Sequence, residues 1–349
     1  MISFVFVHTL AAGIFLTISA FGQASGMKPS PTPTPRVSED NEVIKIDTEL
    51  VNINVRVVDR LSRPIGNLKR GEFKIYEDNV LQEIDFFSQS EVPTNYSMVI
   101  DNSGSLRSQI EKVIEASKIL IGSNKPADET SVIRFVGRDK IEILQDFTPN
   151  KDDLEYALEN LHIDGGQTAI RDAVYLAADR VTEYDKNDSG DDAKRRALIL
   201  ITDGEDRNSF YSEKQLFQLL SETSVQIYVI GFVKDLDDKG NFIQKSDQSK
   251  ARTFLEKLAT DTGGRAYFPN GVEELNGIAK EISSELRTQY SIGYLPSNEK
   301  DDGTFRNIKV LVNDGPNKEK RIAVTRTGRT AGKSDGEPIL QKAVQPIKN

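Results

Sequence analysis

An acid and two hydroxyl side chains stand at alternate positions in the stretch "MVIDNSGSLRS", residues 98–108. Asp101, Ser103 and Ser105 directly follow an apolar run, and small oxygen-bearing side chains at this spacing can serve three purposes. They can cap a helix, supply a nucleophile, or form part of a metal cage that is completed from elsewhere in the chain. The choice depends on which other polar side chains the fold brings to them.

Two later stretches carry polar oxygens that could meet this group. Thr168 lies in the Gly-rich stretch "DGGQTAIRDAV" just before a predicted helix, and Asp203 follows a predicted strand in "LILITDGEDRNS". Ligands of open α/β sheets bind at the carboxyl ends of the strands, so all three stretches are expected at one edge. Two carboxylates and three hydroxyls, without nitrogen or sulfur, favour Mg²⁺, with Mn²⁺ and Ca²⁺ as alternatives. An open position on that ion would accept a carboxylate from a partner protein.

Strands and helices must alternate between residues 96 and 288 to position these side chains. The apolar runs "YSMVI", "SVIRFV", "ALILI", "QIYVIGF" and "RAYF" are typical of buried strands, and segments with helical spacing of apolar residues separate them. This alternation predicts an α/β fold with a Rossmann-like, doubly wound, mostly parallel sheet. The segment 140–147, "KIEILQDF", predicts one antiparallel edge strand.

Strand patterns flank this α/β unit on both sides. Apolar and polar residues alternate at 51–57, and further short strands are predicted up to residue 92 and between 290 and 327. Each flank is too short to bury much core alone. We therefore expect one β-sandwich built from both flanks, with the α/β domain inserted in it. The predicted boundaries are 43–93 and 290–328 for the two parts of the sandwich and 94–289 for the α/β domain.

The two ends of the chain differ from its middle in composition. Residues 2–22 are uncharged and apolar, and small residues follow them, so 1–22 is predicted to be a signal peptide. The same stretch approaches the length of a membrane span, which makes an uncleaved anchor the alternative. A Pro/Thr/Ser-rich linker is predicted at 23–42 and a disordered tail at 329–349. The protein is thus expected to be secreted, periplasmic or on the cell surface, with no membrane span in the mature chain.

Composition excludes several classes of function. The 349 residues carry a net charge of −9, which argues against a nucleic-acid partner. The chain has no Cys, so disulfides, thiolate zinc sites and cysteine nucleophiles are excluded. His162 is the only His outside the predicted signal peptide, and no phosphate-binding motif is recognisable. Ser103 therefore lacks an evident base, and we expect no enzymatic activity.

The three polar stretches together resemble the metal-ion-dependent adhesion site (MIDAS) of von Willebrand factor type A (VWFA) domains. That pattern is Asp-x-Ser-x-Ser, a distant Thr and a distant Asp, and here it is filled by Asp101, Ser103, Ser105, Thr168 and Asp203. The resemblance covers about residues 95–288. It implies that the three hydroxyls bind the metal and that the two carboxylates bind it directly or through water. The flanks resemble those of secreted bacterial "VWFA-related" proteins, in which a β-sandwich embraces the same unit.

The resemblance and the residues together predict an exported binding module, serving adhesion or complex assembly. Through a divalent cation it would capture an acidic side chain of a protein ligand. Two alternatives stay open. The metal could be structural, with contacts made by the β-sandwich, or the protein could be a metal-dependent hydrolase.

Simpler explanations compete for the same residues. Asp101 or Ser103 could cap a helix that begins near Leu106. The stretch 185–192, "DKNDSGDD", imitates the start of an EF-hand loop, but its twelfth position is Arg196 instead of Glu, which favours a surface loop. The charged stretch 234–250 is expected to be a solvated excursion near the site.

Overall fold

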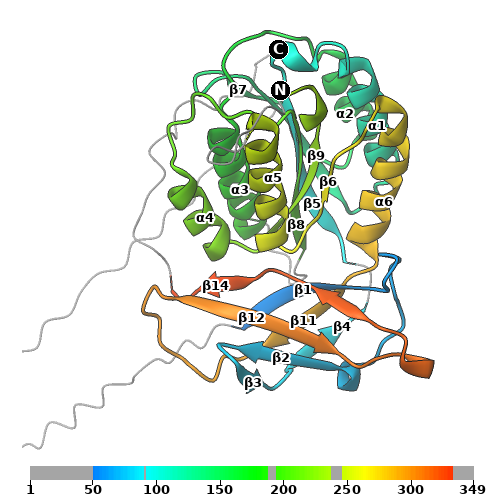
Figure 1. Cartoon of the computed structure of the whole chain (residues 1–349), viewed down its shortest axis with the longest axis vertical. Coiled ribbons are helices and arrows are strands. Elements are labelled where there is room, and N and C mark those ends of the chain that lie inside the picture. Colours follow the sequence, from blue (N-terminus) through cyan, green and yellow to red (C-terminus); the bar gives the residue numbers. More distant parts are fainter. Residues whose placement is uncertain (1–49, 90–91, 188–193, 237–245, 333–349) are drawn as a thin grey trace, which may run out of the picture. The chain divides into compact units, whose positions relative to one another are not determined.

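The computed structural model describes residues 50–89, 92–187, 194–236 and 246–332. All of them belong to one compact unit, Asp47–Asn349. Figure 1 shows that this unit contains an α/β domain and a β-sandwich. The predicted signal peptide and linker lie outside the described residues. No helix within the described ranges is long and apolar enough to cross a membrane.

The α/β domain is built on a six-stranded sheet with the order β10-β9-β8-β5-β6-β7. Neighbouring strands are parallel except for β7, which pairs antiparallel with β6 at one edge. This confirms the predicted doubly wound sheet with one antiparallel edge strand. The strands are β5 (Thr94–Asp101), β6 (Glu129–Phe135), β7 (Ile141–Thr148), β8 (Arg195–Thr202), β9 (Val225–Gly231) and β10 (Ala266–Tyr267).

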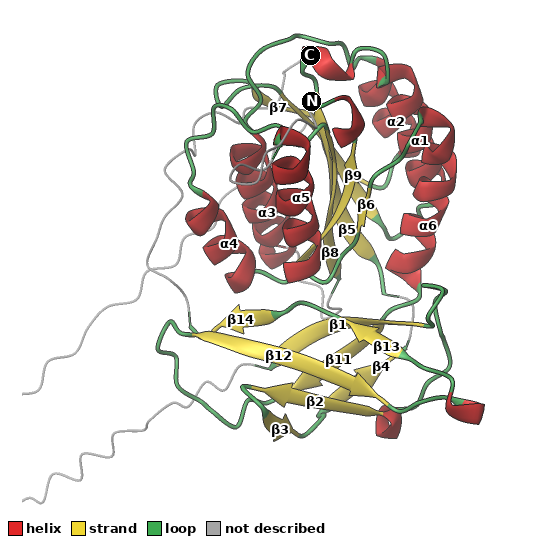
Figure 2. Ribbon diagram, viewed as in Figure 1, coloured by secondary structure: helices red, strands yellow, loops and turns green. Residues whose placement is uncertain are grey.

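Helices cover both faces of this sheet, as Figure 2 shows. One core lies between the sheet and three helices, which are α3 (Ile170–Asn187), α4 (Glu213–Glu222) and α5 (Asp247–Asp261). A second core lies on the opposite face, under α1 (Ile110–Gly122), α2 (Lys151–Glu159) and α6 (Leu275–Arg287). Every residue of β5 is buried because alternate side chains enter the two cores. Val99 belongs to the first core, and its neighbours Met98 and Ile100 belong to the second.

Both flanks together form the predicted β-sandwich. One antiparallel sheet has the order β13-β1-β11-β4 and the other β14-β12-β2-β3, so each contains strands from both flanks. A third core lies between them. The strands are β1 (Val51–Val58), β2 (Phe73–Glu77), β3 (Val80–Gln82), β4 (Phe86–Ser88), β11 (Tyr290–Tyr294), β12 (Phe305–Val312), β13 (Ile322–Val324) and β14 (Gly328–Thr330). Short 3₁₀ turns are η1 (Arg70–Glu72), η2 (Gly104–Leu106), η3 (Val233–Asp235), η4 (Val272–Glu274) and η5 (Pro316–Lys318).

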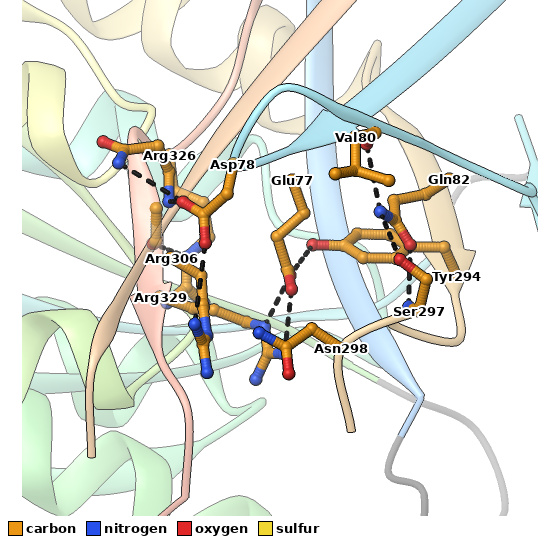
Figure 3. Close-up of polar contacts among 12 residues, drawn as sticks. Glu77, Asp78, Val80, Gln82, Tyr294, Ser297, Asn298, Arg306, Arg326 and Arg329 are labelled. Carbon is orange, nitrogen blue, oxygen red and sulfur yellow. Dashed lines mark hydrogen bonds and ion pairs between the residues drawn. The ribbon is translucent and has the colours of Figure 1, made fainter. Parts of the chain in front are cut away.

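Strand β14 overlaps the start of the range predicted as a disordered tail, 329–349, so this boundary has to move to Gly332 or beyond. A part-buried ion pair between residues far apart in the sequence holds this strand, and sequence patterns do not reveal it. Arg329 Nε donates to Glu77 Oε2 at 3.0 Å, and Tyr294 Oη donates to the same oxygen at 2.7 Å (Figure 3). The remainder of the predicted tail lies outside the described residues.

The α/β domain and the sandwich are also joined by a buried ion pair. Arg56 of β1 donates to Glu285 of α6, and both side chains are almost fully buried. Arg265 Nη1 contacts the second oxygen of Glu285 at 2.9 Å. Since α6 is followed directly by β11, this contact fixes the chain where it leaves the α/β domain.

Candidate metal centre

The predicted site residues Asp101 and Asp203 lie at the ends of two adjacent parallel strands. Asp101 is the last residue of β5, and Asp203 follows the last residue of β8. The two strands pair in register from Thr94 with Arg195 to Ile100 with Ile201, so their carboxyl ends coincide. Both carboxylates are buried, with 0% and 3% of their surface exposed.

Hydrogen bonds connect Asp101 with the two serines and with Asp203. Asp101 Oδ1 accepts from the backbone N–H of Ser103 at 2.8 Å. The hydroxyls of Ser103 and Ser105 lie 2.8 Å apart, and Ser105 Oγ donates to Asp203 Oδ2 at 2.5 Å. Ser105 is exposed whereas the other three residues are buried, so this group of oxygens opens to solvent at Ser105.

Thr168 is held beside the loop that follows β8. Its carbonyl oxygen accepts from the backbone N–H groups of Arg207 at 2.9 Å and Asn208 at 3.1 Å. On the other side of its loop, the N–H of Gly165 donates to the carbonyl of Asn102 at 3.4 Å. The loops that carry the five predicted residues are therefore joined to one another at this edge of the sheet. The Thr168 hydroxyl itself is not hydrogen-bonded to the other four residues.

The electrostatics of this edge favour a cation. Burial raises the pKa of Asp101 to about 7, and the neighbouring charge of Asp203 acts in the same direction. Neither carboxylate forms an ion pair with any Lys or Arg that the structure describes. A divalent ion would compensate both charges at once.

The donor set fits a hard divalent ion better than a transition metal. It consists of two carboxylates and three hydroxyls, all oxygen. Within the described residues no group of three or more His, Cys, Asp or Glu side chains could hold a metal.

The helix-cap explanation of the first stretch finds no support in the geometry. Ser103 precedes the short 3₁₀ turn η2, but its side chain makes no capping hydrogen bond there. The helix α1 begins only at Ile110, and its N-cap residue is Gln109. The hydroxyls of Ser103 and Ser105 thus bond to each other, and that of Ser105 bonds to Asp203, instead of capping a helix.

The described contacts of Ser103 include Ser105 and the carboxylate of Asp101 but no histidine. The ring of His162 lies within hydrogen-bond distance of Arg134 Nη1, at 2.9 Å from Nε2. Its other contacts are the carbonyl of Asn160 and the carboxylate of Asp164. None of these described contacts of the imidazole involves Ser103.

Two further residues support the site and were missed by the sequence patterns. Thr202 Oγ1 donates to Asp101 Oδ2 at 2.7 Å and fixes the orientation of that carboxylate. Asp172 accepts from the backbone N–H groups of Phe210 and Tyr211, each at 2.8 Å, and so holds the loop after Asp203 against α3. Thr202 could have been noticed as the hydroxyl next to Asp203, whereas nothing in the sequence points to Asp172.

Two predicted surface segments are only partly described. Of the EF-hand-like stretch, residues 188–193 lie outside the described part of the chain. Of the charged stretch 234–250, residues 237–245 also lie outside the described part of the chain.

Comparison with known proteins agrees with this fold. The heavy chain H4 of the inter-alpha-trypsin inhibitor from Sus scrofa is 23% identical over 232 residues, and an uncharacterized protein of Synechocystis is 29% identical over 143 residues. These matches cover 64% and 40% of this chain but only 23% and 32% of those relatives.

Several solved structures match this chain at low sequence identity. A von Willebrand factor type A protein from Catenulispora acidiphila is 13% identical, with 80% of this chain and 73% of that chain covered and a TM-score of 0.45. Proximal thread matrix protein 1 of the mussel byssus, described with a zinc-occupied MIDAS motif, is 18% identical, with 56% and 48% covered and a TM-score of 0.44. The von Willebrand factor type A domain family matches residues 97–281, more than half of the chain. The protein belongs to the von Willebrand factor type A domain family.

Proposed function

We propose that this protein is a metal-dependent protein-binding module that serves adhesion or complex assembly. The observation that supports this proposal is that Asp101, Ser103, Ser105 and Asp203 converge at one sheet edge. No Lys or Arg among the described residues forms an ion pair with either of the two carboxylates. VWFA domains are generally binding modules without catalytic activity, and no histidine lies among the described contacts of Ser103.

Each residue has a role in this proposal. Mg²⁺, with Mn²⁺ or Ca²⁺ as alternatives, would be held by the hydroxyls of Ser103, Ser105 and Thr168. Asp101 and Asp203 would bind it directly or through water. When bound, the ion supplies an electrophilic position for an acidic side chain of the partner. Ser105 is exposed, so a partner can approach from its side of the site.

The experiment that tests the site is calorimetric titration of Mg²⁺, Mn²⁺ and Ca²⁺ into residues 47–349, the compact unit. We expect binding by the parent and none by Asp203→Ala. Asp139→Ala is the matched control, because Asp139 is an exposed acid in the turn between β6 and β7. Absence of binding by the parent, or equal loss in both variants, would contradict the proposed ligand set.

The same variants separate this proposal from its two alternatives. Adhesion requires that chelator and Asp203→Ala abolish partner capture while the protein stays folded. A structural metal requires instead that Asp203→Ala lowers the melting temperature and leaves the contacts of the β-sandwich unchanged. A hydrolase requires turnover of an ester or phosphate that is lost in Ser103→Ala.

We also propose that the protein is exported, because residues 2–22 are apolar and uncharged. N-terminal sequencing of the expressed protein would distinguish cleavage near residue 22 from a retained anchor. Recovery of the intact chain from the cytoplasm would contradict export.

A further inference from the structure

One face of the sandwich exposes apolar and lysine side chains side by side. In β12, buried and exposed residues alternate, so every second side chain points away from the sandwich core. In β2 the same outward face carries exposed Lys74 and half-buried Tyr76. We use the name lysine face for five outward residues of β2, β3 and β12, which are Lys74, Tyr76, Leu81, Lys309 and Leu311.

Strand register places these five side chains next to one another. Lys309 pairs with Tyr76, and Leu311 pairs with Lys74. Tyr76 also pairs with Leu81 of the edge strand β3. The two lysines are therefore diagonal neighbours, about 7–8 Å apart, and apolar side chains occupy the other diagonal. Leu81 and Leu311 are 58% and 43% exposed, so the apolar part of this face is open to solvent.

Basic residues gather at one end of the strand pair β2 and β12 in an acidic protein. Neither Lys74 nor Lys309 forms an ion pair with any residue that the structure describes. Two stretches, 69–74 and 309–321, lie at and beyond the same end of the paired strands β2 and β12. Together they carry seven basic and three acidic residues, whereas the whole chain has a net charge of −9. Two of those acids are already paired, Glu72 with Arg321 at 2.7 Å and Asp314 with Lys320 at 3.1 Å.

We propose that the lysine face docks on an anionic membrane surface. The outside of a sheet is broad and shallow, which suits a bilayer better than a groove-seeking protein segment. Lysine stems lie along apolar surface while their ammonium groups reach lipid phosphates. Tyr is favoured at the boundary between headgroups and acyl chains, and Leu81 and Leu311 would enter the same layer. The face lies on the sandwich, so this docking is independent of the metal site.

The test is co-sedimentation of residues 47–349 with vesicles. This unit contains all three cores and lacks the apolar stretch 2–22, which could bind lipid by itself. Vesicles of phosphatidylcholine alone are compared with vesicles of phosphatidylcholine and phosphatidylglycerol in equal parts. We expect binding only to the second kind, weakening as salt screens the lysines.

Variants decide whether the lysine face is responsible. Each lysine near an anionic bilayer contributes about a factor of five in affinity, so Lys74→Glu with Lys309→Glu should weaken binding about 25-fold or more. The matched control changes two exposed lysines of the α/β domain, Lys214→Glu with Lys280→Glu, and should leave most of the binding. Leu311→Ser should weaken binding without any change of charge.

Three results would overturn the proposal. The parent could fail to bind anionic vesicles, or both double variants could lose binding equally, which would indicate net charge alone. The parent could also ignore vesicles but bind polyglutamate through Lys74 and Lys309, which would identify an acidic protein as the occupant. Circular dichroism of each variant checks that the fold is kept.

Discussion

The buried carboxylate of Asp101 predicts an unusual dependence of stability on pH. Its pKa is raised from 3.8 to about 7 in the folded chain, chiefly by burial and then by the charge of Asp203. The folded state therefore holds a proton that the unfolded state releases. As the pH rises from about 4 to about 7, the metal-free protein should lose stability, because the folded state must then bury an uncompensated charge.

The size of this loss follows from the pKa shift. The shift amounts to about three pKa units at 1.36 kcal/mol each, so the free energy of unfolding should fall by up to about 4 kcal/mol. Mg²⁺ takes the place of the proton in compensating the charge. With the ion present at saturation, stability at about pH 8 should recover by a similar amount.

Urea unfolding at about pH 5 and about pH 8, with EDTA or with Mg²⁺, measures these free energies. The variant Asp101→Asn keeps the shape of the side chain and removes its charge. Burial also raises the pKa of Asp172 and of Asp261, which adds to the pH dependence in the same direction. The decisive quantity is therefore the difference between the parent and Asp101→Asn, which cancels those contributions.

We expect that in EDTA, between about pH 5 and about pH 8, the parent loses about 2–3 kcal/mol more stability than Asp101→Asn does, because only the part of the pKa shift above about pH 5 contributes. Mg²⁺ should restore the parent and leave the variant unchanged. If the parent and the variant have the same pH dependence in EDTA, the carboxylate is not buried as the structure has it. If Mg²⁺ stabilises both proteins equally, the ion does not bind at Asp101.

Two more substitutions test the frame around the site. The backbone at Gly204 has φ +87°, and in Gly204→Ala the new Cβ would lie 2.9 Å from Leu255 Cδ1. We therefore expect the free energy of unfolding, measured by calorimetric melting, to fall by about 1–3 kcal/mol, together with weaker Mg²⁺ binding. An unchanged melting temperature would contradict the backbone conformation at Gly204. Glu77→Gln leaves the guanidinium of Arg329 without its charged partner in the sandwich and should cost about 3 kcal/mol in urea unfolding. The exposed acid Glu213, paired with Lys257, is the control, and Glu213→Gln should cost less than about 1 kcal/mol. Equal effects of the two Gln variants would refute the importance of burial at Glu77.

Local patterns in the sequence predicted the strands and their alternation with helices, and they selected the residues of the candidate site. The mostly apolar run "YSMVI" of β5 predicts a buried strand, and the structure confirms this. The order of strands and helices then requires that the polar residues at the ends of β5 and β8 lie at one edge. For this reason Asp101 and Asp203 could be selected from the sequence alone.

Only the tertiary structure decided which polar groups form hydrogen bonds with one another and which surfaces remain exposed to solvent. Ser105 and Asp203 are 98 residues apart, and Glu77 and Arg329 are 252 residues apart. Local spacing contains no information on such pairs, because they depend on which strands lie side by side and in which register they pair. The same register places the lysines of β2 and β12 on one open face. A period of two tells which residues share a face of one strand, but not which strand lies beside it.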